Sequence, residues 1–440
     1  MGYRFSDLED SLDILPQASS DYAAFHDFAA ILKVSTSSTS TGAQTTTPTT
    51  STAASSTTSS NSVIADMIAH ETGGVLTYAG ALAVLQDAAA QTMNATLFAN
   101  LTAAAKDLNV TGGVKASLYV QQIFDDVVLG NSANAWWNGG SNTASKLGNL
   151  SATSTKAQFN DLIGKWFLGT DLPGVGPAPN QNGAYATAYK TYSLPLFTAA
   201  GPQLTDVNQG QLGDCWFLAA AAETALLDPS LIKKLIISDG NGIYSVEFQV
   251  NGKADYVTVN SELPTYTGNI GQWDGSQMEF ANSTTSLWVE LLEKGLAQLA
   301  EQGVTTGVQF GSGSDQYYEL NAGNGEGVTL LTGQACNGYS LAGESGAALT
   351  KLLGQMHTAL AAGDDVMLGT SGLSVGGNLV ADHMFAVTAV NASTGMVTLY
   401  NPWGANSVGG SVATSFTIAA SALVADQATF YAASGATTVV

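Results

Sequence analysis

The sequence is poor in cysteine, in basic residues and in long apolar runs, and each shortage excludes a class of protein. Two cysteines, Cys215 and Cys336, cannot build a disulfide framework, and neither has a second cysteine or a histidine at zinc-ligand spacing. Only 13 Lys and Arg stand against 35 Asp and Glu, a formal net charge of −22, so nucleic acids and anionic membranes are not expected partners. No run of about 18 apolar residues occurs, so no membrane span is predicted.

No signal peptide is predicted from the first residues, because MGYRFSDLEDSLDIL carries acids where a basic segment and an apolar core are needed. Charged residues make up only 11% of the chain, so Ser, Thr, Asn, Gln and Gly must keep the surface soluble. This composition is typical of an exported bacterial protein. We expect a monomer that is secreted by a signal-peptide-independent route, with a cytoplasmic location as the alternative.

Composition and apolar spacing divide the chain into five predicted parts. The stretch 35–62 is almost wholly Ser and Thr and cannot bury apolar surface, which predicts a linker. Gly and Pro near 172–180 mark a later boundary. The predicted parts are an N-terminal helical segment (1–34), the Ser/Thr-rich linker (35–62), a helical accessory or propeptide-like domain (63–180), and two lobes of one core (190–315 and 316–433).

Within the core, local patterns predict both helices and strands. Strong helix formers follow Cys215 as far as Pro229, and LWVELLEKGLAQLAE at 287–301 is amphipathic. Two β-rich runs, 243–250 and 254–260, are joined by NGK, a strong hairpin signal. A helix at 351–363 and strands at 383–390 and 396–404 predict a β-rich second lobe.

The core is organised around QGQLGDCWF, from Gln209 to Phe217, which predicts a loop leading a cysteine into a helix start. A thiol there lies among unpaired backbone N–H groups at the positive end of the helix dipole, so a thiolate is favoured. The alternative is that Cys215 is only a small core residue, since Cys is often buried. These residues alone leave the two interpretations open.

A thiol nucleophile needs a base, a group that orients the base, and an oxyanion donor. Of the four histidines, His383 is the best base because it starts a strand above an apolar run, whereas His357 lies within a helix. Asn401, at the end of the next strand, would meet His383 if the strands are antiparallel neighbours and could orient its ring. Gln209 could direct its amide N–H at the oxyanion. The combination predicts a thiol enzyme.

The residues QGQLGDCWFLAA, DHMFAVTAV and LYNPWG resemble the three catalytic motifs of the calpain protease core. The resemblance includes LPT at 263–265 and LWVELLEKG at 287–295, and it covers about residues 195–430. Papain-type enzymes share the Cys, His, Asn order but place the histidine about 130–150 residues after the cysteine. The longer gap here, together with GDCW and NPWG, favours calpain.

The resemblance implies an α+β fold: a papain-like, two-lobed cysteine protease core with a helical lobe, a β-rich lobe and an N-terminal helical accessory region. It implies that Cys215 is the nucleophile, His383 the general acid and base, Asn401 the orienting residue and Gln209 the oxyanion donor. Trp403 resembles the tryptophan that blocks or leaves the cleft in this family. Two alternatives remain, an acyl transferase on the same fold and a catalytically silent, secreted binding protein.

Calpain cores often bind two calcium ions, so the resemblance implies possible calcium regulation. For the first lobe, Asp206, Glu293 and a carbonyl of Gly201 are available as hard oxygen ligands. The alternative is a loop or capping acid at Asp206 and a helix-surface acid at Glu293, paired with Lys294 or solvent. The second lobe lacks an acid after NPWG, so we expect one calcium site, in the first lobe. The expected substrate is a protein or peptide.

Overall fold

The computed structural model describes residues 61–141, 143–175, 187–266, 269–270, 273–274, 278, 280–304, 316–321, 323–373, 377–404 and 412–433. The predicted N-terminal segment and the predicted linker up to residue 60 lie outside these residues. Asn61 and Ser62, the last residues of that predicted linker, belong instead to the start of a helix. The Asn61 side chain accepts hydrogen bonds from the backbone N–H groups of Val63 and Ile64 and caps it.

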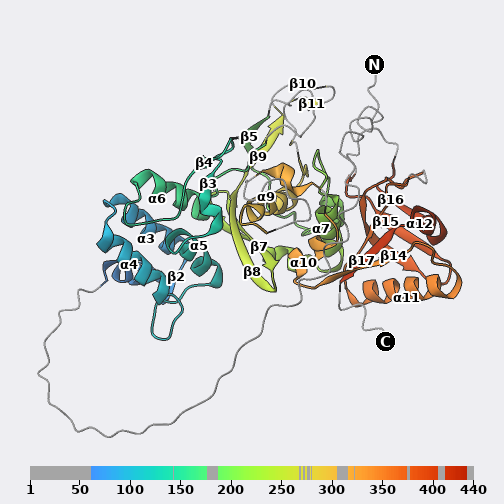
Figure 1. Ribbon diagram of the computed structural model, residues 1–440, viewed down its shortest axis with the longest axis horizontal. Coiled ribbons are helices and arrows are strands. Elements are labelled where there is room, and N and C mark those ends of the chain that lie inside the picture. The colour runs from blue at the N-terminus through green and yellow to red at the C-terminus, as the bar shows by residue number, and fades with distance from the viewer. Residues whose placement is uncertain are drawn as a thin grey trace, which may run out of the picture. The chain divides into compact units, whose positions relative to one another are not determined.

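The first described part is helical, as its apolar spacing predicts (Figure 1). Asn, Thr or Ser side chains cap each of its α-helices, and Phe124, Phe159 and Phe167 lie in its core. Its elements are α2 (Ser62–Ala69), β1 (Glu71–Thr72), β2 (Val75–Leu76), α3 (Tyr78–Ala90), α4 (Ala95–Asp107), α5 (Leu118–Val128), η2 (Ser132–Ala135), β3 (Trp136–Trp137), β4 (Ser145–Lys146), α6 (Lys156–Ile163) and the π-helix η3 (Gly164–Leu168).

A three-stranded antiparallel sheet, in the order β6-β7-β8, follows next to this helical part. The predicted hairpin is confirmed: Asn251 and Gly252 connect two of its strands, and both have the positive φ that a tight primed turn requires. Helix α5 and η3 contact β8, and Tyr256 of β8 belongs to the helical core. The strands are β6 (Ile236–Gly240), β7 (Ile243–Val250) and β8 (Lys253–Asn260), with β5 (Thr187–Thr191) pairing β9 (Glu262–Tyr266) beside them.

The helices of the first lobe pack against this sheet and against each other (Figure 1). Helix α7 (Cys215–Leu227) is apolar on all sides and buried almost throughout, whereas α9 (Trp288–Glu301) carries buried acids among its apolar residues. Both helices were predicted from the sequence. The remaining elements are η4 (Leu204–Asp206), α8 (Pro229–Leu235), β10 (Asn269–Ile270), β11 (Trp273–Asp274), η5 (Tyr317–Leu320) and α10 (Glu326–Thr332).

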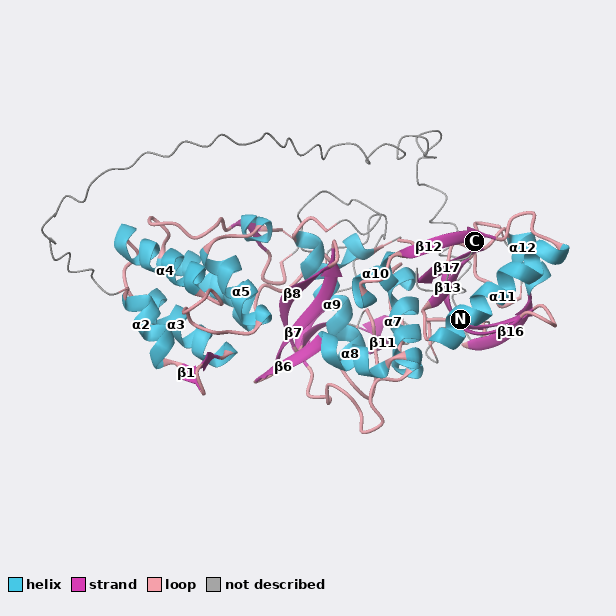
Figure 2. Ribbon diagram, turned by 90° about the horizontal axis from the view of Figure 1, so that it is seen from below, coloured by secondary structure: helices cyan, strands magenta, loops and turns pink. Residues whose placement is uncertain are grey.

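The second lobe is built on a six-stranded antiparallel sheet in the order β12-β17-β13-β14-β15-β16. Its predicted β-rich character is therefore confirmed. Helix α11 packs against the face of the sheet that carries Val366, Leu368 and Phe385 (Figure 2). The opposite face carries Met367 and Met384, which join the core around α7. The elements are β12 (Cys336–Ser340), α11 (Gly346–Ala362), β13 (Val366–Gly369), β14 (Met384–Asn391), β15 (Met396–Tyr400), β16 (Ser415–Ala419), α12 (Ala420–Asp426) and β17 (Thr429–Ala433).

The change from one lobe to the other comes later than the predicted boundary at 315/316. Elements η5 and α10 pack with the first lobe, because Leu320 and Val328 lie in its core and α10 contacts α7. The Trp216 indole N–H donates to the Leu320 carbonyl at 2.9 Å. By packing, the second lobe begins with β12.

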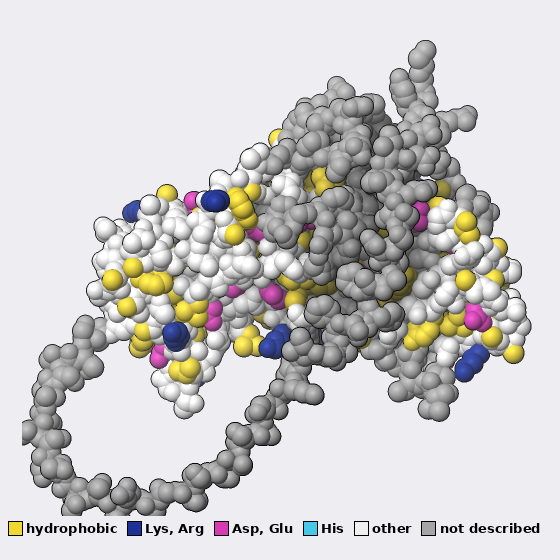
Figure 3. Space-filling model, viewed as in Figure 1, with side chains coloured by type: hydrophobic (Ala, Val, Ile, Leu, Met, Phe, Trp, Pro, Cys, Tyr) yellow, Lys and Arg dark blue, Asp and Glu magenta, His cyan; other side chains and the backbone are white. Residues whose placement is uncertain are grey.

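The described surface carries few charges. On the face drawn in Figure 3 it is mostly uncharged, with scattered hydrophobic, acidic and basic side chains. Within the described residues no single helix is long and apolar enough to cross a membrane, and only α7 and α8 taken together, bent by 120°, meet those criteria.

Candidate active site

Cys215 is the first residue of α7, and its thiol is half-buried and free. The helix begins there because the Asp214 carbonyl accepts hydrogen bonds from the N–H groups of Phe217 and Leu218. Trp216 and Phe217 are fully buried and fix the first turn in the core. The thiol therefore has a fixed position at the end of a buried helix.

His383 and Asn401 come together because β14 and β15 are antiparallel neighbours, with Ala386 opposite Tyr400. The imidazole Nε2 lies 2.8 Å from the Asn401 Oδ1, and both side chains are buried. The same Oδ1 accepts the Trp403 backbone N–H at 3.0 Å, which identifies it as the oxygen of the amide. Nε2 of the neutral ring must then carry the proton, so the lone pair is on Nδ1, as a general base requires.

The residue after His383 connects β14 to the thiol of Cys215. The backbone N–H of Met384, the residue after His383, reaches the Cys215 sulfur as a hydrogen-bond donor. Helix α7 also packs directly on β14. The two lobes thus meet where the thiol and the imidazole are placed.

Burial governs the protonation of both groups. Desolvation raises the pKa of Cys215 to about 12, although the N–H groups of Met384 and of the helix start oppose it, and the neighbouring Asp214 charge adds to the rise. Desolvation lowers the pKa of His383 to about 4, opposed by its bond to Asn401. The predicted preference for a thiolate stays a prediction, since burial opposes the effect of the helix start in this conformation. Both shifts favour the neutral forms, the thiol and the neutral imidazole.

Two aromatic rings enclose the imidazole. The Trp403 ring lies 4.9 Å from the His383 ring at 49°, and Phe385 meets it edge-on at 4.8 Å. Trp403 is half-buried and follows directly after the turn that holds Asn401. These contacts keep water away from the ring and explain the low pKa of His383.

In this conformation the side-chain amide of Gln209 is engaged within its own loop instead of being free to donate to an oxyanion. Its side-chain Nε2 donates to the Leu212 carbonyl at 2.6 Å, and its Oε1 is buried without a hydrogen-bond partner among the described residues. Its backbone N–H donates to the Pro402 carbonyl at 2.8 Å. In this conformation the amide therefore fixes the loop before Cys215.

The turn after β15 packs directly on that loop. The Tyr400 hydroxyl donates to the Val207 carbonyl at 3.1 Å. Gly404 has φ +66, and a Cβ on it would lie 2.1 Å from the Asn208 Oδ1, so only glycine fits. The turn NPWG and the loop before Cys215 thus form one contact between the lobes.

The carboxylates of the two predicted acidic calcium ligands both accept hydrogen bonds within the protein. Asp206 Oδ2 accepts the Gln203 N–H at 2.9 Å and the Trp288 indole N–H at 2.8 Å, while both oxygens of Glu293 accept the Ala281 N–H at 3.2 and 3.0 Å. Glu293 is buried, so the alternative of a helix-surface acid is wrong. Gly201 has a backbone φ of +81°, in the left-handed region that favours glycine.

Lys294 does not pair with Glu293. Its ammonium group donates to the carbonyls of Asn260 and Glu262 and to the Asn260 Oδ1. An ammonium group does lie near the loop at Gly201, where the Lys233 Nζ is 2.9 Å from the position a Cβ would take.

Two further acids lie near these ligands, Asp214 and Glu290, and the sequence analysis did not single them out. Burial raises the pKa of Glu290 and of Glu293 well above the usual range, and that of Asp214 to about 7. One oxygen of Glu290, Oε2, has no hydrogen-bond partner among the described residues. Buried carboxylates with spare oxygens suit a hard cation, so the donor chemistry fits calcium. The spacing of Glu290 and Glu293, one turn apart on α9, is the signal that could have identified Glu290.

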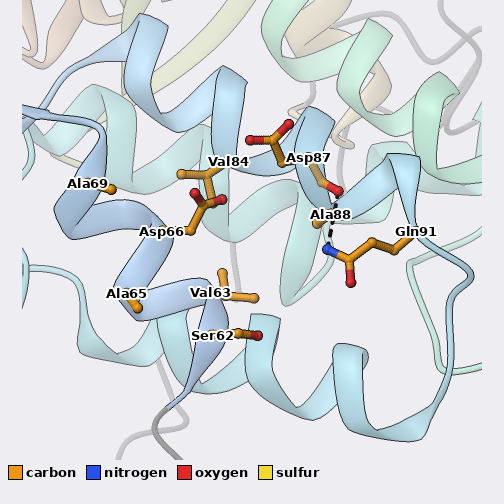
Figure 4. A pocket seen from close by; sticks show the side chains of 9 residues that line it. All are labelled: Ser62, Val63, Ala65, Asp66, Ala69, Val84, Asp87, Ala88 and Gln91. Carbon is orange, nitrogen blue, oxygen red and sulfur yellow. Dashed lines mark hydrogen bonds between the residues drawn. The ribbon is translucent and has the colours of Figure 1, made fainter.

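A separate group of acids lies on the helical part. Asp66 and His70 of α2 and Asp87 of α3 have ligand atoms within 4.8 Å of one another. Asp66 and Asp87 line a cavity between α2 and α3 (Figure 4). The Asp66 Oδ1 lies 3.3 Å from His70 Nδ1, and both side chains are about one-third exposed. A partly exposed i,i+4 contact of this kind is common on helix surfaces.

The lobes, the thiol at a helix start and the imidazole held by an amide oxygen define the class of a papain-like cysteine protease. The profile described as calpain family cysteine protease matches residues 186–417. That match spans more than half of the 440 residues, and the chain therefore belongs to the calpain family of cysteine proteases. The α+β architecture described above agrees with this family.

The similar proteins are much longer than this chain. It is 29% identical over 214 residues to the calpain-type cysteine protease DEK1 of Zea mays, covering 48% of this chain and 9% of that protein. It is 29% identical over 257 residues to mouse calpain-8, covering 52% of this chain and 32% of that protein. It is 34% identical over 144 residues to the chicken calpain-2 catalytic subunit, covering 29% and 19%. The chain thus spans about a third of each relative's length or less.

Proposed function

We propose that the chain is a cysteine endopeptidase in which Cys215, His383 and Asn401 form the catalytic triad. The observation that carries the proposal is the bond from His383 Nε2 to an Asn401 oxygen whose identity is fixed by the Trp403 N–H. That bond leaves Nδ1 as the base, on a ring whose neighbour Met384 contacts the sulfur.

The reaction follows from these protonation states. His383 Nδ1 takes the thiol proton as the Cys215 sulfur attacks the peptide carbonyl, and the resulting oxyanion is held by the Cys215 N–H and the Gln209 amide. The imidazolium, held by Asn401, returns that proton to the leaving amine as the C–N bond breaks. A water then loses a proton to Nδ1, attacks the thioester, and restores the thiol. For Gln209 to act, its amide must turn from the Leu212 carbonyl.

Peptide hydrolysis by purified variants tests the triad. Cys215→Ala should abolish cleavage of casein while the circular dichroism melt stays that of the wild type. Cys336→Ser, which removes the other thiol, should cleave normally. Asn401→Ala should lower kcat by about 10²-fold or more, because the ring loses its orientation. Full cleavage by the Cys215 variant would contradict the proposal.

We also propose that calcium regulates the enzyme through one site in the first lobe, which Asp206, Glu293 and the Gly201 carbonyl would hold. The support is that Asp206 and Glu293 are buried carboxylates, which offer hard oxygen ligands. Bound calcium would supply positive charge between acids that otherwise repel one another, and it takes no part in bond making. Hydrolysis measured with calcium and with a chelator tests this part, and equal rates would contradict it.

The protein or peptide substrate is expected for any member of this family, whereas location and assembly are proposals. We propose a monomer, without nucleic-acid or membrane partners, that is exported independently of a signal peptide. The net charge of −22 and the sparse charges support this. Sedimentation gives the mass in solution, and recovery from the cell pellet alone would contradict export.

A further inference from the structure

The loop before Cys215 is held from a distant part of the first lobe by the side chain of Asn321. The Asn321 Oδ1 accepts the backbone N–H of Gly213 at 2.5 Å, across 108 residues of sequence. Its Nδ2 donates to the Tyr318 carbonyl at 3.0 Å, so both bonds agree on which end of the amide is the oxygen. Asn321 directly follows η5, which contacts α9. The loop is therefore tied to the body of the first lobe at this point.

The N–H of Gly213 belongs to the same peptide group as the carbonyl of Leu212. That carbonyl accepts the Nε2 of Gln209 at 2.6 Å. A trans peptide group is planar, and its N–H and C=O point in opposite directions, so the Asn321 bond also fixes the direction of the Leu212 carbonyl. One peptide group thus connects Asn321 on one side with the proposed oxyanion donor on the other.

The peptide group before Gly213 also has a second orientation open to it. Gly213 is exposed and has no Cβ, so this group can turn over at little steric cost. The Oε1 of Gln209 is buried without a hydrogen-bond partner among the described residues, which makes it a competing acceptor for the Gly213 N–H. After such a turn, the Gln209 amide would be held by its oxygen, opposite to its present orientation. The bond to Asn321 excludes this arrangement because it keeps the Gly213 N–H occupied.

We propose that Asn321 is a positioning residue for the hydrolysis proposed above. By holding the Gly213 N–H, it keeps the peptide group in the orientation from which the Gln209 amide turns toward the oxyanion. The inference rests on the proposed role of Gln209 as the oxyanion donor of a cysteine endopeptidase. An oxyanion donor acts in the transition state, so losing its position should lower kcat and leave KM nearly unchanged.

Steady-state hydrolysis of a fluorogenic peptide tests the inference, with the peptide copied from a site that the wild-type full chain cleaves in casein. Asn321→Ala removes the acceptor and should lower kcat about tenfold, with KM changed less than about twofold. Asn321→Asp keeps the Oδ1 acceptor and should retain kcat to within about threefold. The matched control is Asn324→Ala, which removes an exposed asparagine from the same segment and should leave kcat unchanged.

A second comparison separates an action through Gln209 from a general effect on the fold. Gln209→Ala alone should lower kcat by about 10²-fold, because it removes the donor. Adding Asn321→Ala to that variant should cost less than about a further twofold, whereas two independent defects would multiply. Circular dichroism melts check that each variant is folded. If Asn321→Ala does not fold, Asn321→Ser, whose hydroxyl is a shorter acceptor, replaces it and should lower kcat at least about threefold, only when Gln209 is present.

The outcomes separate the inference from the proposal on which it rests. An unchanged or higher kcat in folded Asn321→Ala overturns the inference, as does a change confined to KM, an equal loss in Asn321→Asp, or a loss that persists at full size without Gln209. Hydrolysis by Cys215 stands in each of these cases. A wild-type kcat in Gln209→Ala overturns the inference together with the proposed donor. Cleavage by Cys215→Ala contradicts the endopeptidase itself, and its own assay measures that.

Discussion

At Cys215 two opposing effects act on one thiol. The helix start and the Met384 N–H favour the thiolate, while burial and the Asp214 charge disfavour it, and the result is a pKa of about 12. His383, enclosed by Trp403 and Phe385, stays neutral above pH 4 or so. In this conformation the sulfur becomes reactive only as its proton leaves.

Alkylation of the thiol should therefore increase steadily with pH. In the Cys336→Ser background, the rate with iodoacetamide should rise about tenfold per pH unit between pH 6 and 9, because the thiolate fraction does so below the pKa. The rate constants are measured by mass spectrometry of the intact protein. A rate that is already at its plateau near pH 6 would mean that a thiolate and imidazolium pair exists in the resting enzyme.

At the scale of elements, α9 links the site to the helical part. Its first turns carry Glu290 and Glu293, and its last residue, Glu301, lies 2.6 Å from the Lys165 ammonium of η3. The same ammonium lies 2.6 Å from Asp171, and all three side chains are at most 2% exposed. Further hydrogen bonds join Gln122 of α5 to Asp255 of β8. These contacts make the helical part a packed neighbour of the first lobe.

Lys165→Ala should destabilise the protein by about 3–5 kcal/mol, because it leaves two buried carboxylates without their cation. Urea unfolding followed by circular dichroism measures the change. The matched control is Lys156→Ala, which removes an exposed lysine from the start of α6 and should have little effect. Equal stability of the two variants would show that the buried ion pairs contribute nothing.

Local patterns predicted the elements and the triad candidates, but not the groupings that depend on distant pairs. Helix α7 and the hairpin at Asn251 follow from propensity and turn chemistry over a few residues. The placement of α10 in the first lobe and the partners of Glu290 depend on contacts between segments far apart in the chain.

Across the whole molecule, buried acids recur on both lobes and on the helical part. Burial raises the pKa of Asp126 to about 7, of Asp239 to about 6 and of Asp365 to about 7, and that of Glu223 well above its usual range. The unfolded chain releases these protons near pH 4. Between about pH 4 and these raised pKa values, the folded protein therefore binds more protons than the unfolded chain. His383 acts in the opposite sense: its lowered pKa means that the folded protein binds fewer protons than the unfolded chain below about pH 6.5.

Stability should therefore fall as pH rises from about 4 to about 7, since the free energy of unfolding decreases with pH wherever the folded state binds more protons. The net charge of −22 acts in the same direction by self-repulsion. Calorimetry in metal-free buffer should give a melting temperature several degrees higher at pH 5.5 than at pH 8, and the reverse order would contradict the argument. Asp365→Asn keeps an acceptor for the Thr224 hydroxyl without the charge, so it should raise the melting temperature more at pH 8 than at pH 5.5.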